Sequence, residues 1–455
     1  MSAPRARQTA TLERVAFKTS RRAEFVGQRE LTAQIGHPPH DWPLVILKEL
    51  LDNALDECEE AKIPPEISVT VSTLRGEIAV RDNGRGLPAK TVGDILDYSS
   101  RTSSREAYVS PTRGAQGNAL KTLLAMPFAL HGASGTTVVE AQNERNTITF
   151  RVDQLRQEEV IDRKSIPLVP HKNGTSICIG WPESACSILA DAKPRFLQIA
   201  DDFGWLNPHL RIRVEWDDEV LVDRGPSAPA WEKWRACDPT SAHWYDPARF
   251  ERYIAALVRH DQDHGRGRTI REFISELRGF FGSAKQKIVL DETGLARAPL
   301  SSLFELSGEA RHTDIERLRL VLQTHSKPVK PKDLGLIGKD HLLACFTKAK
   351  VEPETFKYQK TLGETDGLPW VVETAFGWCP DNGDRRRIIA GINWSVALSN
   401  PFRSFGPDGE GLEYLLADQR ASSKEPVIFV LHFACPQVGY TDRGKSAVTL
   451  PGGDE

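Results

Sequence analysis

The first strong pattern along the chain is helical and covers residues 42–62. Apolar side chains recur there at every third or fourth position, which places them on one face of an α-helix. This face comprises Leu44, Leu47, Leu51, Leu55 and Cys58. The other positions are mostly polar, so the pattern predicts an amphipathic helix whose leucines pack on a core.

After Pro64 and Pro65 the pattern changes to alternation of apolar and polar residues. Alternate positions are apolar from Ile67 to Val71 and from Ile78 to Val80, and Arg75 and Gly76 lie between the two runs as a turn. This pattern predicts a β-hairpin. Further strands are predicted at residues 136–141, 147–152, 175–180 and 212–216.

The rest of the chain divides into two further regions. Residues 225–247 are rich in Pro, Ser and Trp and predict a connection, with a domain boundary near residue 228. Helical patterns at 247–259 and 269–281, with shorter ones to about 306, indicate a small helical module. The last region has a helical pattern at 313–324 and strand patterns at 370–378, 388–394 and 427–434. A chain of 455 residues exceeds what one core usually serves. We therefore expect an α+β protein with domains at 1–228, 229–310 and 311–455.

Composition narrows the classes of function. The formal net charge is -3, so a nucleic acid would have to bind a local basic patch rather than a global basic field. The seven cysteines form no CxxC pair, which argues against a zinc site and a disulfide framework. We find neither a signal-like segment nor a run of 18 apolar residues, so we expect a cytoplasmic protein without a membrane partner.

The helix at 42–62 has three candidate ligands on its polar face. Glu49, Asn53 and Asp56 are spaced i, i+4 and i+7 and share one stripe. The alternative is an ordinary solvated face, which is what most charged stripes are. Asn53 weakens that alternative, because asparagine is a poor residue for the interior of a helix.

The next candidate is VRDNGRGLP at residues 80–88, where a strand ends and Asp82 begins a turn. An ordinary Asn-Gly turn is the alternative, but such a turn needs only one glycine. Gly84 and Gly86, one residue apart after an acidic residue, suit a flat ring that slides against the backbone. The Asp82 carboxylate would accept a hydrogen bond from an exocyclic amine. These properties describe an adenine site.

Two weaker elements follow. Residues 98–117 are rich in Ser, Thr and Gly, lack periodicity and run into a helical pattern at 119–126, as expected of a functional lid. The sequence RGAQGNALK at 113–121 offers backbone amides to a phosphate at the start of that helix. Gly174 and Thr175 precede an alternating strand and are nearly uninformative alone.

In this order the four elements resemble the Bergerat fold of the gyrase, heat-shock chaperone, histidine kinase and MutL (GHKL) ATPases, an α/β sandwich. The resemblance implies that the chain binds ATP and Mg²⁺, with Glu49 as general base and Asn53 as a metal ligand. Asp82, Gly84 and Gly86 would hold adenine, and Thr175 would support Asp82 through a water. The remaining nucleotide contacts implied are Arg113, Gly114, Gln116, Gly117, Asn118 and Lys121. Ala119 stands where the lid usually has a glycine, which puts lid closure in doubt.

Within this superfamily the chain is most similar to the B subunits of topoisomerase VI. The similar segments are SRRAEF at 20–25, LNPHL at 206–210, residues 269–288, residues 332–343 and residues 427–448. The resemblance implies a helix-two-turns-helix module and a C-terminal transducer of the ribosomal S5-like type, in which Lys445 reaches the γ-phosphate. It also implies an ATP-dependent homodimer, DNA as a partner and an A-subunit-like nuclease partner that cleaves the DNA.

Two features limit the resemblance. GYTDRGKS at 439–446 also fits the P-loop pattern, but a P-loop needs a following helix and a parallel sheet, and Pro451 follows closely. We therefore reject the P-loop. B subunits continue past the switch lysine into a helix that docks on the DNA-cleaving partner, whereas ten residues follow Lys445 here. A GHKL clamp that signals ATP state to another partner, in repair or in defence against mobile elements, stays open, as does a non-hydrolysing scaffold.

Overall fold

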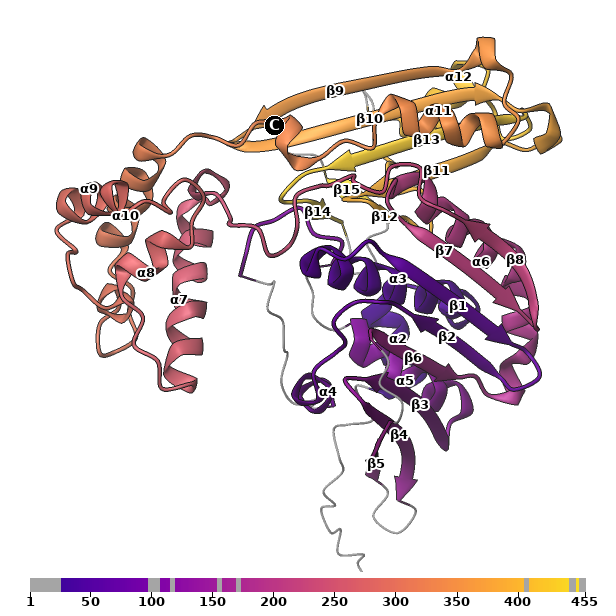
Figure 1. Ribbon diagram of the computed structural model, residues 1–455, viewed down its shortest axis with the longest axis horizontal. Coiled ribbons are helices and arrows are strands. Elements are labelled where there is room, and N and C mark those ends of the chain that lie inside the picture. The colour runs from indigo at the N-terminus through magenta and orange to yellow at the C-terminus, as the bar shows by residue number, and fades with distance from the viewer. Residues whose placement is uncertain are drawn as a thin grey trace, which may run out of the picture.

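The computed structural model describes residues 26–96, 107–114, 119–153, 158–168, 173–404, 409–441 and 447–449. Figure 1 shows three parts: an N-terminal sheet with its helices, a group of helices to one side, and a second long sheet across the first part. The fold is α+β, as the sequence predicts.

The N-terminal part is built on an eight-stranded sheet of order β5-β4-β3-β6-β2-β1-β7-β8. The strands are β1 (Glu66–Ser72), β2 (Glu77–Arg81), β3 (Ser134–Ala141), β4 (Glu144–Asp153), β5 (Glu158–Pro167), β6 (Thr175–Gly180), β7 (Arg211–Trp216) and β8 (Glu219–Arg224). The predicted hairpin is confirmed, because β1 and β2 pair antiparallel with Val69 opposite Val80. The sequence did not predict β5 and β8.

The helices described in this part are α2 (Gln28–Ile35), α3 (Trp42–Ala61), α4 (Ala89–Ile95), α5 (Ala119–His131) and α6 (Cys186–Leu206). Helices α3, α5 and α6 pack on strands of the sheet, and α2 packs on α5. The leucines of α3 are buried, as their spacing predicts. The sequence did not predict the 21-residue α6, in which Pro194 interrupts the helical pattern without ending the helix.

The helical group contains α7 (Pro247–Asp263), α8 (Ile270–Ser275), α9 (Ser283–Thr293) and α10 (His312–His325). The predicted helix at 269–281 is wrong beyond residue 275, because the chain turns at Gly279, whose φ is +90°. The boundary predicted at residue 310 places α10 in the third domain, but α10 packs on α7 and α9 (Figure 1). The structure therefore moves the end of the helical module past residue 325.

The second sheet has the order β12-β11-β13-β10-β9. Its elements are β9 (Lys357–Thr365), β10 (Leu368–Trp378), β11 (Arg387–Ile392), β12 (Ser395–Val396) and β13 (Val427–Ala434), with helices α11 (Lys339–Lys348) and α12 (Leu412–Asp418). The three predicted strands are confirmed. Helix α6 of the N-terminal part packs against β11 and β12, so the second sheet contacts the N-terminal part through this helix.

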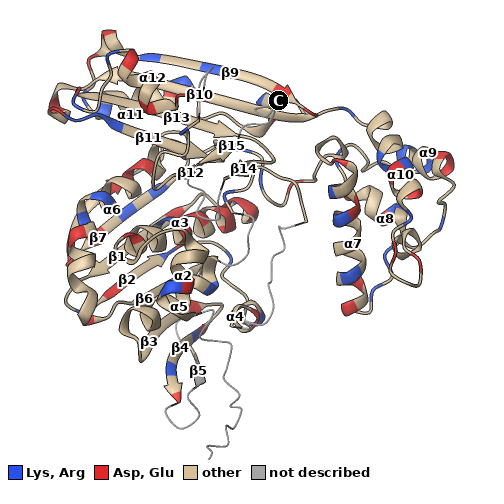
Figure 2. Cartoon of the chain, turned by 180° about the vertical axis from the view of Figure 1, so that it is seen from behind, with Lys and Arg blue, Asp and Glu red and all other residues tan. Residues whose placement is uncertain are grey.

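A short hairpin follows the second sheet and lies between it and α3 (Figures 1 and 2). Its strands are β14 (Gly439–Tyr440) and β15 (Val448–Thr449), which pair antiparallel. The P-loop-like segment 439–446 thus begins in β14, and the chain returns to pair with β14 within a few residues.

Candidate functional site

The polar face of α3 divides into two stripes with different surroundings. On one stripe Glu49 is half-buried, with 23% of its side chain exposed, and Asn53, one turn later, is exposed. On the other stripe Asp52 and Glu59 are buried. The first stripe can meet a ligand, whereas the second is covered by the rest of the protein.

Lys48 joins the two stripes. Its Nζ lies 3.0 Å from Oε1 of Glu49 and 2.9 Å from Oδ2 of Asp52. Burial lowers the pKa of Lys48, but the attraction of Asp52 and Glu49 outweighs burial and raises the pKa above its ordinary value. Lys48 therefore stays charged and holds the carboxylate of Glu49 in place.

Asp82 lies at the end of β2 with its side chain buried. Its Oδ1 accepts hydrogen bonds from the backbone amides of Gly84 at 2.8 Å and Thr175 at 3.1 Å. Both bonds use the same oxygen, so Oδ2 can accept a hydrogen bond from a ligand. Burial raises the pKa of Asp82, and the two amide hydrogen bonds oppose that shift.

Two glycines allow the Asp82 loop to pack closely. A Cβ on Gly84 would lie 2.8 Å from Cγ of Glu57, so the loop runs directly against α3, one turn beyond Asn53. Gly174 has φ +85°, and a Cβ there would lie 1.9 Å from the carbonyl oxygen of Asp82. The Asp82 loop, α3 and the start of β6 therefore meet at one place, as the order of the motifs predicts.

Hydrogen bonds of the Asn83 and Thr175 side chains fix this loop. Oδ1 of Asn83 accepts from the amide of Glu66 at 3.0 Å, and its Nδ2 donates to the carbonyl of Pro64 at 3.0 Å. The hydroxyl of Thr175 accepts from the amide of Leu87 at 3.0 Å. Asn83 thus ties the loop to the exit of α3, which is a structural reason for the Asn-Gly pair.

Arg113 has a different environment from the one the sequence suggested. Its guanidinium is buried and donates to both oxygens of Glu59 at 2.7 Å, to Asp56 at 2.7 Å and to Asn207 at 2.5 Å. Asp56, expected on the ligand stripe, is likewise buried in this cluster. We therefore leave Arg113 and Asp56 out of the nucleotide contacts that we propose below.

The cluster around Glu59 links several segments. Lys233, in the segment before the helical module, lies 2.9 Å from Glu59, and Nε2 of His209 lies 3.1 Å from it. Burial raises the pKa of Glu59, but the charges of Arg113 and Lys233 outweigh burial, and the net shift of the pKa is well below the usual range. Glu59 is therefore ionised at neutral pH.

The other predicted residues are only partly placed. Gly114 is half-buried, with open space where a Cβ would point, and Lys121 is buried on α5. Gln116, Gly117 and Asn118 lie outside the described residues, as do Lys445 and the segment 20–25. Their assignments stay predictions from the resemblance.

The hairpin β14–β15 brings the end of the chain to α3. Tyr440 on β14 is half-buried, and its hydroxyl lies within the electrostatic influence of Lys48, Asp52 and Glu49. Desolvation is the main cause that raises the pKa of Tyr440 to about 12. The segment 441–447 therefore starts beside the Glu49 stripe.

The residues of α3 and the Asp82 loop fit an Mg²⁺ ion that binds together with a nucleotide better than a metal centre made of protein ligands alone. In the described part of the chain no group of three or more His, Cys, Asp or Glu side chains is arranged to hold a metal ion. Mg²⁺ usually takes one or two protein ligands and completes its shell with phosphate oxygens and waters. The exposed Asn53, beside the Asp82 loop, can supply such a ligand.

Comparison with known proteins identifies the family of the domain that contains these residues. Residues 41–156 match the family model of the histidine kinase-, DNA gyrase B- and HSP90-like ATPases. Residues 41–156 form a GHKL ATPase domain. The match contains α3 with Glu49 and Asn53 and the loop with Asp82. Gly174 and Thr175 lie beyond the matched residues but contact Asp82.

Relatives extend the likeness beyond the GHKL domain. The chain is 26% identical over 429 residues to the B subunit of type 2 DNA topoisomerase 6 from Archaeoglobus fulgidus, covering 89% of this chain and 66% of the relative. It is 22% identical over 437 residues to the protein of the same name from Saccharolobus islandicus, covering 88% of this chain and 74% of the relative. The chain thus spans about two thirds of the Archaeoglobus protein.

Solved structures whose sequences are only about a tenth identical to this one also align with the chain. One is the ATPase region of Saccharomyces cerevisiae topoisomerase II bound to ICRF-187, with a TM-score of 0.39 and 11% identity, covering 89% of this chain and 77% of that one. Another is the N-terminal domain of a DNA repair protein, with a TM-score of 0.42 and 10% identity, covering 93% and 92%.

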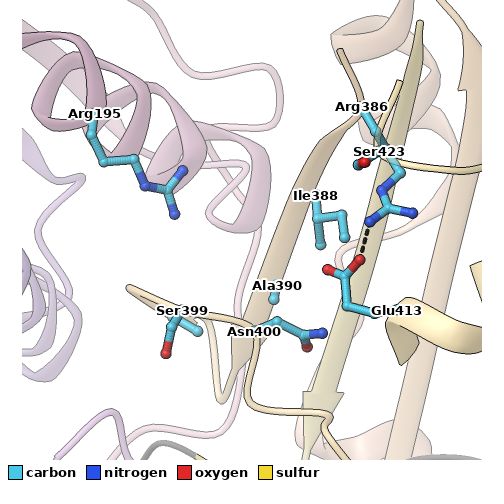
Figure 3. Close-up of a pocket in the computed structure, with 9 residues that line it drawn as sticks. Arg195, Arg386, Ile388, Ala390, Ser399, Asn400, Glu413 and Ser423 are labelled. Carbon is cyan, nitrogen blue, oxygen red and sulfur yellow. Dashed lines mark hydrogen bonds and ion pairs between the residues drawn. The ribbon is translucent and has the colours of Figure 1, made fainter. Parts of the chain in front are cut away.

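A separate polar cavity of about 240 Å³ lies where α6 meets the second sheet (Figure 3). Arg195 of α6 points into it, opposite an ion pair between Arg386 and Glu413. None of the residues predicted to bind nucleotide lines this cavity. Across the described residues, no helix combines the length and the apolar character that crossing a bilayer requires.

In the GHKL domain, Asp82→Asn is expected to weaken ATP binding by about ten- to hundredfold, the effect of losing a hydrogen bond to a charged group. The single amide oxygen of the variant side chain would have to accept from Gly84 and Thr175, which would turn its NH₂ group toward the amine of adenine. Titration calorimetry with ATP measures the change, and Asp223→Asn on the exposed edge of β8 is the matched control. Unchanged affinity in the Asp82 variant would contradict the adenine role.

ATP affinity is also expected to depend on pH through Asp82. Oδ1 already accepts two amide hydrogen bonds, so protonation would place a hydrogen on Oδ2, where it would face the N–H of the adenine amine. Burial raises the pKa of Asp82. Affinity should therefore be full above this raised pKa and fall as the pH drops through it, at a higher pH than an ordinary aspartate would give. Calorimetry across mildly acidic pH checks this, and Asp82→Asn should remove this component of the pH dependence.

Proposed function

We propose that this chain is the ATP-binding and hydrolysing subunit of a type IIB, topoisomerase VI-like assembly that dimerises on ATP to gate DNA. The observation that supports it most is the meeting of the Glu49 and Asn53 stripe with the Asp82 loop inside a GHKL domain. The similarity to topoisomerase 6 B subunits along most of the chain gives the second support.

In this proposal the Asp82 loop binds the adenine, and α3 supplies the residues that act on the phosphates. Asp82 accepts from the amine of adenine, and Gly84 and Gly86 let the ring approach the backbone. Asn53 is a ligand of the Mg²⁺ that neutralises charge on the phosphates. Glu49 orients the attacking water and takes its proton, because its half-buried carboxylate is held in place by Lys48.

The second sheet is proposed to act as the transducer. Its hairpin β14–β15 lies beside the Glu49 stripe, and Lys445 follows Tyr440 by five residues. We propose that Lys445 contacts the γ-phosphate and that hydrolysis releases this contact, turning the transducer against the GHKL domain.

DNA and a DNA-cleaving partner belong to the proposal because the relatives are named as subunits of a DNA topoisomerase. Lys and Arg are spread over all three parts rather than gathered into one field (Figure 2). The helical module has both signs of charge on α7 to α10 (Figure 2). A DNA contact would accordingly be local and salt-dependent.

Sedimentation and ATPase assays test this proposal together. We expect Mg²⁺-dependent hydrolysis, and a shift from monomer to dimer when a non-hydrolysable ATP analogue is added. Asp82→Asn should abolish both at moderate nucleotide concentration. Recovery of a nuclease partner with the analogue-bound protein from its host would support the topoisomerase assembly. DNA-stimulated hydrolysis without DNA relaxation, and without such a partner, would favour the GHKL clamp instead.

A further inference from the structure

A side chain of the second sheet reaches the charged residues next to Glu49. The hydroxyl of Ser395, at the start of β12, donates to Oδ2 of Asp52 at 2.7 Å. The same oxygen accepts from Lys48 at 2.9 Å, and Lys48 contacts Glu49 at 3.0 Å. Ser395 and Asp52 are both buried. A continuous chain of contacts therefore joins the transducer-like sheet to the proposed general base.

Asp52 has a second partner within reach. Its Oδ1 is buried without a hydrogen bond, and so is Nε of Arg113, which lies 4.0 Å from it. Because unpaired buried polar groups are costly, a small rotation of Asp52 that pairs these two atoms is favourable once Ser395 no longer holds Oδ2. That rotation would move Asp52 away from Lys48. Lys48 would then lose Asp52 and interact with Glu49 alone. Its ammonium group would bind the Glu49 carboxylate more closely, and that carboxylate would no longer be oriented toward the attacking water.

The turn before Ser395 is held rigidly. Asn393 and Trp394 have φ of 50° and 63°, a turn geometry that is strained for tryptophan. The amide of Trp394 donates to Nε2 of His432 at 3.1 Å, and its carbonyl accepts from Asn207 at 3.0 Å. Such strain persists only where the surroundings determine the backbone. The turn that positions Ser395 is therefore fixed from both sides, by His432 of the second sheet and by Asn207 at the end of α6.

The same turn also contacts Thr112, in the segment 98–117 that the sequence predicts to be a lid. Nδ2 of Asn393 donates to the carbonyl of Thr112 at 3.3 Å, and its Oδ1 accepts from the amide of Cys435 at 2.9 Å. Thr112 directly precedes Arg113, the alternative partner of Asp52. A shift of the second sheet would thus alter both possible partners of Asp52 at once.

We propose that Ser395 is a positioning residue for ATP hydrolysis: through Asp52 and Lys48 it keeps Glu49 oriented for base catalysis only while the second sheet is docked on α3. This inference rests on the proposed ATPase function. It adds a route from the second sheet to the general base that does not pass through Lys445 or the nucleotide.

The test compares Ser395→Ala with Ser395→Thr, which keeps the hydroxyl and suits a strand. We expect Ser395→Ala to lower kcat by about ten- to hundredfold, the scale of a lost hydrogen bond to a charged group. KM and the Kd for the non-hydrolysable analogue should stay within about twofold, well under the tenfold that one such bond would cost in binding. Ser395→Thr should restore most of kcat. Ser399→Ala, an exposed serine four residues later, is the matched control and should behave as wild type.

Three results would overturn the inference. An active wild type with unchanged kcat in Ser395→Ala would remove the role of Ser395 and leave the proposed function standing. A joint loss of kcat, nucleotide affinity and thermal stability that threonine does not restore would mean that Ser395 has only a structural role. A wild type without any ATP hydrolysis would remove the proposed function and this inference with it.

Discussion

Glu49→Ala is expected to retain ATP binding and to lower the rate of ATP hydrolysis by about 10²- to 10⁴-fold, the usual contribution of a general base. The carboxylate lies on the exposed stripe of α3, where Lys48 fixes it, and the adenine contacts lie on the Asp82 loop instead. A coupled phosphate-release assay gives kcat, and calorimetry gives the Kd for ATP.

Glu60→Ala is the control for this prediction because it removes a carboxylate from the same helix, outside the proposed contacts. Its turnover should match that of the wild type. Wild-type turnover in the Glu49 variant would show that another group activates the water. A loss of ATP binding in the Glu49 variant, with the fold intact, would show that Glu49 holds the nucleotide rather than the water.

Arg113→Met is expected to lower the free energy of unfolding by about 3–5 kcal/mol, because removing one partner of a buried ion pair leaves uncompensated charge. The carboxylates left behind are Asp56 and Glu59, of which Glu59 would still have Lys233 and His209 beside it. Urea denaturation of the two proteins measures the difference.

Arg75→Met gives the comparison, since Arg75 pairs with Glu77 on the surface, with 55% and 43% of the two side chains exposed. Surface pairs contribute little, so this variant should unfold much like the wild type. If Arg113→Met were as stable as wild type but bound ATP weakly, Arg113 would contact nucleotide, as the resemblance first suggested, and the buried cluster would not be its main role.

The sequence predicts the elements that depend on local periodicity. The leucine spacing of α3, the alternation in β1 and β2 and the apolar runs of β10 and β13 each give the observed element, because burial on one face is a local property of the sequence. Helix α6 was missed because Pro194 disturbs that signal. The helix predicted at 269–281 failed because the chain turns at Gly279.

Tertiary partners are what the sequence does not predict. The polar face of α3 is continuous in the sequence, yet the structure leaves Glu49 and Asn53 accessible and buries Asp52 and Glu59. Lys233 covers Glu59 and Ser395 covers Asp52, and both residues are far from α3 along the chain. An acidic residue that will be buried has the same local pattern as a solvated one, so Asp52 gave no signal of its own.

The site shows the same division. The motifs identify the GHKL domain, and the structure brings the Asp82 loop, α3 and the start of β6 together. Arg113 lies next to a glycine-containing loop in the sequence, so it was grouped with the phosphate contacts. Its real partners, Glu59 and Asn207, are 54 and 94 residues away, and no local pattern connects them.

The most direct test of the central claim is a crystal structure with Mg²⁺ and a non-hydrolysable ATP analogue. We predict the amine of adenine at hydrogen-bond distance from Oδ2 of Asp82, Mg²⁺ coordinated by Asn53, and a water between Glu49 and the γ-phosphate. A triphosphate wrapped by the backbone of residues 439–446, with adenine away from Asp82, would contradict it.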